Sequence, residues 1–419
     1  MPASNAFYAQ SGGVTAVINA SAAGVIEAAR AHPEAIGTVY AGVNGILGAL
    51  HEQLIDTAHE SPQTLAALRH TPGGAFGSAR YKLKDLDTHR AQYERLIEVF
   101  RAHDIGYFFY NGGGDSQDTA LKVAQLGESM GYPITCIGVP KTVDNDLPVT
   151  DTCPGFGSVA KYIAVATREA GLDVASMAET STRVFILETM GRHAGWIAAA
   201  SALARDHDTA PPHVILLPEV PLDEQRFLDR VRDCVTRIGY CVVVVSEGLR
   251  RADGAFVADQ GTRDAFGHAQ LGGVAPAIAG LVREHLGYKY HYAIADYLQR
   301  AARHIAAATD VEQAHQLGRA AVDRAVAGEN AVMPTIVRDS DAPYRWHIGQ
   351  VALEAVANRE AKLPAAYISD DGLHVTESAL RYLRPLIAGE DYPPYRDGLP
   401  EYARLRGERV APRCPPFRD

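Results

Sequence analysis

The stretch ITCIGVPKTVDND, residues 134–146, decides the fold because it joins an apolar strand to a polar loop. Its first six residues are apolar or β-branched, which is typical of a parallel strand buried on both faces. Lys141, Thr142, Asp144 and Asp146 follow directly, and open α/β sheets bind ligands at the carboxyl ends of such strands. Two acids and one base at this edge suggest proton transfer beside a phosphate. The alternative is an ordinary Asx-rich turn that bonds its own backbone.

Strand-like runs alternate with helical segments along most of the chain. Spacers of about 10 to 18 residues between the runs are the signature of doubly wound parallel sheets. A chain of 419 residues is too long for one core of usual size, so we predict an α/β protein with two Rossmann-like doubly wound domains. The predicted strands cover residues 6–10, 36–41, 105–110, 134–139, 183–187, 214–217, 240–245, 291–297 and 364–368. The predicted helices cover residues 15–30, 87–103, 119–130, 157–170, 196–204, 223–238, 274–286, 300–308, 310–327 and 377–386, and residues 264–273 are predicted to form a loop.

The two domains are each assembled from separate parts of the chain. We assign residues 1–155 and about 300–345 to the first domain, and residues 156–299 with part of 346–419 to the second. Pro and Arg are frequent near the end of the chain, so residues 390–419 are expected to form a tail on the surface of the protein or of a partner.

The composition of the chain indicates which kinds of partner the protein binds and in which cellular compartment it is expected. A net charge of −10 and a pI of about 5.9 give no basic footprint for nucleic acid or an anionic membrane. The five cysteines show no CxxC spacing, which favours reduced thiols. The N-terminus lacks the charged and apolar regions of a signal peptide, and no apolar run reaches eighteen residues. We therefore expect a soluble, cytoplasmic protein without nucleic-acid or membrane partners.

Glycine-rich turns follow two further strands of the first half. Gly12-Gly13 leads into an Ala-rich helix, whose N-terminal amides attract anions, although simple turn geometry would also explain the pair. The sequence Asn111-Gly-Gly-Gly-Asp115-Ser116 makes room for a group close to the backbone. Asp115 could cap the next helix or hold Mg²⁺. In the loop that ends at Arg80, the guanidinium could bind phosphate oxygens or could be incidental.

Charged side chains also follow the strands of the second half. Arg192, in the sequence Met190-Gly191-Arg192, and Glu247 both come directly after apolar runs. A cation and a carboxylate at such positions could hold a polyol phosphate, whereas each one alone could equally form a surface ion pair.

In order and spacing, these segments resemble the phosphofructokinase family over roughly residues 6–330. The resemblance rests on Gly12-Gly13, Gly77 to Arg80, Gly112 to Ser116, Pro140 to Asp146, Met190 to Arg192, Glu247 and Tyr297 to Arg300. Two positions resemble the pyrophosphate-dependent branch. ATP-dependent members typically read GGDGS and PGTIDND, with glycine where this chain has Asp115 and Lys141. Glycine leaves room for a nucleotide, whereas Lys and Asp fill that space.

The resemblance implies reversible, Mg²⁺-dependent phosphoryl transfer from diphosphate to the 1-hydroxyl of fructose 6-phosphate, in glycolysis or gluconeogenesis. Asp144 would accept the hydroxyl proton, Asp115 would carry Mg²⁺, and Lys141 and Arg192 would balance phosphoryl charge. It places the donor in the first domain, on Gly12, Gly13, Arg80, Gly113 and Ser116. It places the sugar phosphate largely on the second domain, on Thr142, Val143, Asp144, Asp146, Met190, Gly191, Arg192, Glu247, Tyr297 and Arg300. Arg183 matches an arginine that in relatives reaches the neighbouring subunit's sugar phosphate, which implies a homo-oligomer, with a dimer favoured over a tetramer.

Three departures from the family pattern leave questions open. Gly114 stands where relatives have an aspartate, Val14 where many have Asp, and His291 where an intersubunit Arg often sits. The acceptor could therefore be fructose 6-phosphate, sedoheptulose 7-phosphate or another sugar phosphate. Alternative functions are an ATP-dependent sugar-phosphate kinase of the same fold, a kinase acting on NAD or lipid, and a catalytically silent regulatory subunit.

Overall fold

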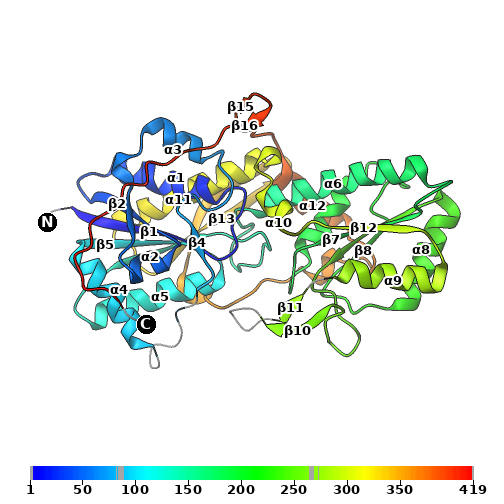
Figure 1. The fold of residues 1–419 in the computed structure, drawn as a ribbon, viewed down its shortest axis with the longest axis horizontal. Helices are drawn as coiled ribbons and strands as arrows, with labels where there is room; N and C mark the ends of the chain where they lie inside the picture. The colour runs from blue at the N-terminus through cyan, green and yellow to red at the C-terminus, as the bar shows by residue number, and fades with distance from the viewer. Residues whose placement is uncertain (1–2, 82, 84–88, 264–268, 272, 418–419) are drawn as a thin grey trace.

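The computed structural model describes residues 3–81, 83, 89–263, 269–271 and 273–417, and it contains two α/β bodies side by side (Figure 1). The first body is built on a sheet with the strand order β14-β13-β6-β5-β1-β2-β3, and β4 also pairs with β1. Strands β6, β5, β1 and β2 are parallel, as their buried apolar sequences predict. The strands are β1 (Ser4–Ser11), β2 (Ile36–Gly42), β3 (Leu54–Asp56), β4 (Ser78–Ala79), β5 (Ile105–Gly112), β6 (Thr135–Pro140), β13 (Val332–Asp341) and β14 (Tyr344–Ala352).

Helices cover both faces of this sheet. On one face, α1 (Ile18–Ala31) packs against α11 (Ala308–Val326), although the two are far apart in the sequence (Figure 1). Their backbones approach closely at Gly24, where an added Cβ would lie 2.2 Å from the carbonyl oxygen of His315. The opposite face carries α2 (Ile46–Leu50), α4 (Arg90–Ala102) and α5 (Gly114–Ser129). The first domain therefore has a doubly wound core in three layers.

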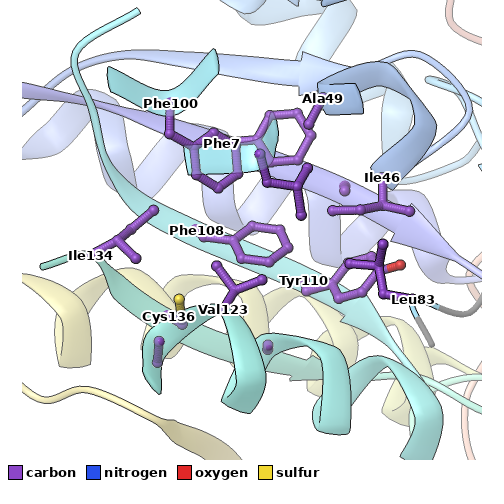
Figure 2. Close-up of a cluster of buried hydrophobic side chains, with 14 of the residues drawn as sticks. Phe7, Ile46, Ala49, Leu83, Phe100, Phe108, Tyr110, Val123, Ile134 and Cys136 are labelled. Atoms are coloured by element: carbon purple, nitrogen blue, oxygen red, sulfur yellow. The ribbon is translucent and has the colours of Figure 1, made fainter. Parts of the chain in front are cut away.

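Aromatic rings fill the core under α4. Figure 2 shows Phe7 from β1, Phe100 from α4 and Phe108 from β5 pointing toward one another. The ring centroid of Phe7 lies 5.3 Å from that of Phe100 and 5.5 Å from that of Phe108. Because side chains alternate along a strand, Tyr8 points to the other face and packs with the α1 cluster.

The second body is a parallel sheet with the strand order β12-β7-β9-β8. Its strands are β7 (Val184–Thr189), β8 (Val214–Leu216), β9 (Cys241–Ser246) and β12 (Tyr290–Ile294). One face packs against α8 (Glu224–Ile238) and α9 (Val274–Leu286), and the other against α6 (Phe156–Met177), α7 (Trp196–Ala200) and α12 (Glu377–Leu383). The prediction of two doubly wound domains is confirmed.

Several predicted elements differ from the observed ones. Residues 364–368 do not form a strand, because Ala365–Tyr367 make a 3₁₀ turn. The predicted helix 300–308 is replaced by α10 (Asp296–Ala301) and a 3₁₀ turn, Arg303–Ile305. Helix α5 begins at Gly114 rather than near residue 119, since the first amides of a helix need no intrahelical partner and glycine is tolerated there.

The segment between β2 and β4 also has more structure than the sequence patterns indicate. The helices α2 and α3 (Pro62–Leu68), the strand β3 and a 3₁₀ turn at Thr57–His59 were not predicted. Between residues 259 and 273, where a loop was predicted over 264–273, the described residues include the antiparallel strands β10 (Asp259–Arg263) and β11 (Ala269–Leu271). Residues 264–268 and 272 of that predicted loop lie outside the described residues. The same is true of the start of the helix predicted at residue 87.

The C-terminal part of the chain packs against both bodies. Strands β13 and β14 extend the first sheet, α12 packs on the second body, and the tail returns to the edge of β3, where Ile55 and Arg409 form an antiparallel bridge. A small hairpin of β15 (Tyr395–Arg396) and β16 (Leu399–Pro400) precedes this return. Within the described residues, none of the helices has the length and apolar character required to cross a bilayer.

Candidate active site

The carboxyl ends of β4, β1, β5 and β6 lie next to one another at a single edge of the first sheet. Ser11 is the register partner of Ala79, and Gly112 is the partner of Pro140. Gln10 and Asn111 pair in the same way between β1 and β5. The turns that follow these strands are therefore neighbours, which brings Gly12-Gly13, Arg80, Gly113–Ser116 and Lys141–Asp146 to one place.

Lys141 joins two of these strand ends. Its Nζ donates a 2.7 Å hydrogen bond to the carbonyl oxygen of Gly13, and only 4% of the residue is exposed. Burial lowers the pKa of Lys141 to about 8, although Asp144 and Asp146 oppose the shift. The ammonium group is therefore held beside the β1–α1 turn, and it loses its proton more readily than an ordinary lysine.

Cationic side chains lie close to the β1–α1 turn, and the positive φ of its first glycine favours glycine there. Gly12 has a φ of +71°, and a Cβ there would lie 3.6 Å from Lys141 Nζ. A Cβ on Gly13 would lie 2.6 Å from Arg300 Nη1 and 3.4 Å from Arg80 Nη2. Arg80 and Arg300 therefore converge on Gly13 from the first sheet's edge and from α10, and three cationic side chains surround this turn.

The Pro140–Asp146 loop holds two carboxylates of altered acidity. Burial, with the charges of Asp146 and Glu247, raises the pKa of Asp144 to about 7, while Lys141 and Arg192 oppose the shift. Burial also raises the pKa of Asp146. A carboxylate that titrates near neutral pH is suited to accept a proton from a hydroxyl group.

Thr142 orders this loop. Its Oγ1 accepts a 3.0 Å hydrogen bond from the Asp144 amide, and its side chain also bonds the Asp146 carboxylate. Val143 packs its side chain into the buried apolar cluster of the second domain. Of the predicted sugar-binding residues in this loop, Thr142, Asp144 and Asp146 therefore hold polar side chains at the site, whereas the side chain of Val143 contributes to the core.

The turns after β7 and β9 complete the site from the second domain. The Glu247 amide donates to the carbonyl oxygen of Thr189 at 2.9 Å, and Gly191 N lies 3.4 Å from Glu247 Oε1. Burial raises the pKa of Glu247, against the opposing charge of Arg192. Because Glu247 and Arg192 also shift the pKa of Asp144, the groups of the two domains share one electrostatic environment.

Helix α10 contributes an arginine stacked on an aromatic ring. The Arg300 guanidinium carbon lies 3.9 Å from the ring centroid of Tyr297, and 58% of Tyr297 is exposed. The amide of Met190 bonds the Gln299 side chain at 3.3 Å, which links α10 to the turn after β7. Arg300 therefore faces the β1–α1 turn while its helix is held by the second domain.

Asp115 and Ser116 occupy the first turn of α5. The N-cap of this helix is Gly113, so the alternative role of Asp115 as the N-cap is wrong. Burial raises the pKa of Tyr110 to about 12, and the nearby Asp115 carboxylate adds to the shift. One carboxylate at this edge fits Mg²⁺, which usually takes one or two protein carboxylates and completes its shell with water and substrate phosphates.

Arg183 is the predicted residue that the structure does not bring to this site. It is exposed and precedes β7, at the opposite end of the strand from Met190. A contact between Arg183 and a sugar phosphate at this site would therefore have to come from another subunit.

Two further residues near the site were not predicted from the sequence. Glu360 pairs with His193 at 3.0 Å and raises the pKa of Asp146, and the neighbouring Ala361 amide donates to the Asp146 carbonyl. No local pattern around residue 360 indicates this contact. Asn19 is fully buried in α1. Its position as a single amide side chain in an Ala-rich helix is a signal in the sequence that could have identified it.

Comparison with known proteins identifies the family. A phosphofructokinase family model matches residues 5–325. The chain belongs to the phosphofructokinase family. It is 68% identical over 405 residues to pyrophosphate--fructose 6-phosphate 1-phosphotransferase of Methylococcus capsulatus, covering 97% of this chain and 96% of that protein. It is 64% identical over 414 residues to the protein of the same name from Halomonas elongata, with 99% of each covered.

A solved structure gives the same result for the fold. The crystal structure of pyrophosphate-dependent phosphofructokinase from Marinobacter aquaeolei superimposes with a TM-score of 0.91 at 62% identity, covering 99% of this chain and 100% of that chain. The predictions of the phosphofructokinase fold and of the pyrophosphate-dependent branch are confirmed. The part that Asp115 and Lys141 play in donor choice stays a prediction.

Proposed function

We propose that the chain catalyses reversible phosphoryl transfer from diphosphate to the 1-hydroxyl of fructose 6-phosphate, giving fructose 1,6-bisphosphate and phosphate. The observation that carries this proposal is the position of Lys141, whose Nζ bonds the Gly13 carbonyl at 2.7 Å. An ammonium group there occupies space beside the donor turn and supplies charge for a small, highly anionic donor. The names of the two relatives described above support the same reaction.

The proposed proton acceptor is Asp144. With a pKa of about 7, it is largely ionised just above neutrality and remains basic enough to take the proton of a sugar hydroxyl. Thr142 holds the Asp144 backbone at 3.0 Å and bonds Asp146, so both carboxylates keep their positions as the acceptor binds. The proton moves from the 1-hydroxyl to an Asp144 oxygen while the hydroxyl oxygen attacks the terminal phosphorus atom of diphosphate. The bond from that phosphorus atom to the bridging oxygen breaks, and phosphate leaves with the bridging oxygen.

Charge on the transferring phosphoryl group is balanced mainly by the side chains that meet at Gly13. Lys141, Arg80 and Arg300 approach the β1–α1 turn from three different segments. Arg192 adds positive charge from the second domain. Phosphoryl transfer depends largely on positioning and charge stabilisation, so these groups and the glycine-turn amides supply what the protein must contribute.

A Mg²⁺ ion held by Asp115 is part of the proposal. When bound, it would neutralise charge on the phosphate oxygens. Gly113 and Ser116 of the same turn are proposed to bind the donor. The sugar phosphate is proposed to bind Met190 to Arg192, Glu247, Tyr297 and Arg300, with the loop residues Thr142, Val143, Asp144 and Asp146.

We also propose a cytoplasmic homodimer in which Arg183 reaches the partner's sugar phosphate. Arg183 lies beside the edge strand β12, and the exposed Tyr292 and Ile294 of that strand offer apolar surface to a second copy. Size-exclusion chromatography with light scattering tests the assembly, because a monomer at micromolar concentration would exclude it.

The test of the reaction is fructose 1,6-bisphosphate formation with diphosphate or ATP supplied in parallel, each with Mg²⁺. Activity with diphosphate alone would support the proposal, and activity with ATP alone would overturn the donor assignment. If neither donor gives activity, with fructose 6-phosphate or with sedoheptulose 7-phosphate as the acceptor, the result would favour a regulatory subunit. Repeating the assay with Mg²⁺ removed by a chelator, and with Asp115→Asn, tests the metal.

A further inference from the structure

Arg303 is a charged residue with no exposed surface. It lies in the 3₁₀ turn directly after α10, three residues beyond Arg300, and its relative exposure is 0%. Burying a guanidinium group is costly unless its charge and its donors are satisfied. A charge buried this completely, so near the site, must have specific partners.

The guanidinium of Arg303 binds two other segments of the chain. Its Nε and Nη2 donate to the carbonyl oxygen of Arg69 at 3.0 and 2.9 Å, and Nη2 lies 3.2 Å from His70 Nδ1. Nη2 also bonds Asp391 Oδ1 at 2.5 Å, and Nη1 donates to the Asp391 carbonyl oxygen. Arg303 therefore connects α10, the segment after α3 and the start of the C-terminal tail.

The Asp391 carboxylate balances the buried charge. Burial alone would raise its pKa, but hydrogen bonds from His70 and Arg303 lower it to about 2. The ion pair is therefore intact throughout the physiological range of pH. Lysine could not replace this arginine in full, because a single ammonium nitrogen cannot span the same carbonyl groups and carboxylate as the planar guanidinium.

The segment that Arg303 holds leads directly into the donor loop, residues 71–80. The start of this loop is fixed from its other side by Asn19, whose Nδ2 donates to the carbonyl oxygens of Thr71 and Gly73 at 2.7 and 2.9 Å. Asn19 Oδ1 accepts a 3.0 Å hydrogen bond from the Ala75 amide. The loop ends at Arg80, one of the two arginines that converge on Gly13.

Helix α10 has anchors of its own in the second domain. The Ala295 amide, just before the helix, donates to the Glu188 carbonyl oxygen at 3.0 Å, and Gln299 bonds the Met190 amide. If the contacts of Arg303 are lost, α10 therefore keeps its place, and the change falls on the start of the donor loop, which then depends on Asn19 and on the pairing of β4 with β1.

We propose that Arg303 is a positioning residue that fixes the donor loop 71–80 relative to α10 and thereby sets the distance between Arg80 and Arg300. Arg303 links the two elements at the start of the loop, and at the other end of the loop one arginine from each element approaches Gly13. This inference rests on the proposed diphosphate-dependent reaction. Its expected signature is weaker use of diphosphate with smaller effects on the sugar phosphate.

The test compares steady-state kinetics of the full chain with Arg303→Lys and Asp391→Asn. Because a misplaced binding group sharply reduces the use of its ligand, Arg303→Lys should raise the KM for diphosphate about tenfold and the KM for fructose 6-phosphate much less. Asp391→Asn, which keeps the backbone contacts, should give an intermediate rise. The increase in thermal midpoint caused by added diphosphate should shrink in the same order.

Arg95→Lys is the matched control. Arg95 is also buried and bonds a carbonyl oxygen, that of Leu50, at 3.0 Å, but it lies in α4, away from the donor loop. It should lower stability without changing the KM for diphosphate. An equal rise in that KM for Arg95→Lys, or an unchanged KM in Arg303→Lys, would overturn the inference. If Arg303→Lys does not fold, an unchanged KM in Asp391→Asn would do so. An unmodified protein that cannot use diphosphate would instead overturn the proposed function.

Discussion

Asn145 Nδ2 donates a 2.9 Å hydrogen bond to the hydroxyl of Tyr382, which ties the middle residue of the Asp-Asn-Asp sequence to α12. Its Oδ1 accepts from the Cys153 amide, also at 2.9 Å, and only 4% of Asn145 is exposed. The flanking Asp144 and Asp146 are the carboxylates proposed to act in the site, whereas Asn145 fixes the loop that carries them. Helix α12 therefore supports the Pro140–Asp146 loop through one side chain.

Removing this support should loosen both carboxylates. Asn145 has a φ of 54°, a conformation that Asn tolerates better than Ala. Asn145→Ala should therefore cost about 2 to 4 kcal/mol of stability and lower kcat about tenfold. Tyr382→Phe should have a smaller effect of the same kind. Tyr367→Phe, which removes a hydroxyl from the ring whose centroid lies 5.7 Å from that of Tyr382, serves as the control and should leave kcat unchanged. Thermal unfolding and steady-state rates measure both effects.

Replacement of the proposed base should affect the chemical step rather than binding. Asp144→Asn keeps the shape of the side chain but cannot accept a proton, so kcat should fall by a factor of about 10² to 10⁴. The KM values for diphosphate and sugar phosphate should change only a few-fold. Initial rates under saturating Mg²⁺ measure both quantities, and a kcat near that of the unmodified protein would remove Asp144 from this role.

Lys141 should determine how well diphosphate is used. Lys141→Gly removes the ammonium group beside Gly13 and opens space there, so the KM for diphosphate should rise about 10- to 100-fold, as expected for the loss of a charged hydrogen bond. The KM for fructose 6-phosphate should change much less. Parallel assays with diphosphate and ATP provide the measurement, and unchanged diphosphate kinetics would make this lysine purely structural.

The activity should follow a narrow bell-shaped dependence on pH. Asp144 must be deprotonated to act as the base, so the rate should rise as pH increases through about 7. Lys141 must be protonated to bind the anionic donor, so kcat/KM for diphosphate should fall as pH increases above about 8. Lys141→Arg should move the basic limb to higher pH, because the guanidinium keeps its proton. A flat profile between pH 6 and 7 would contradict the acidic limb.

The sequence was sufficient to predict the parts of the site in which a polar loop directly follows an apolar strand. Strand β6 and Lys141 are of this kind, since a buried parallel strand determines where its loop emerges. Glu360 could not be predicted, because long-range packing alone brings it beside Asp146. The early start of α5 was missed for another reason, as glycines that indicate a loop are also compatible with the first turn of a helix.

The C-terminal tail is anchored on the buried side chain of Glu52. Its Oε1 accepts hydrogen bonds from the Arg413 amide at 2.5 Å and from the Cys414 amide at 3.1 Å, and it lies 2.7 Å from His103 Nε2. Burial alone would raise the pKa of Glu52, but these hydrogen bonds lower it below its ordinary value of 4.5. Glu52 therefore contributes stability above the pKa of the unfolded chain, and this contribution is lost as pH falls through the lower folded value.

Glu52→Gln should accordingly lower the free energy of unfolding by about 1 to 3 kcal/mol at pH 7, and the difference from the unmodified protein should shrink as the pH falls below about 4.5. The activity per folded molecule should be unchanged, because His103 precedes β5 and so places Glu52 at the amino edge of the sheet, opposite the site. Glu98→Gln is the control, since this half-exposed partner of Arg95 should contribute less than about 1 kcal/mol. Denaturant unfolding at several pH values measures the difference, and equal losses in the two variants would show that the tail is not anchored through Glu52.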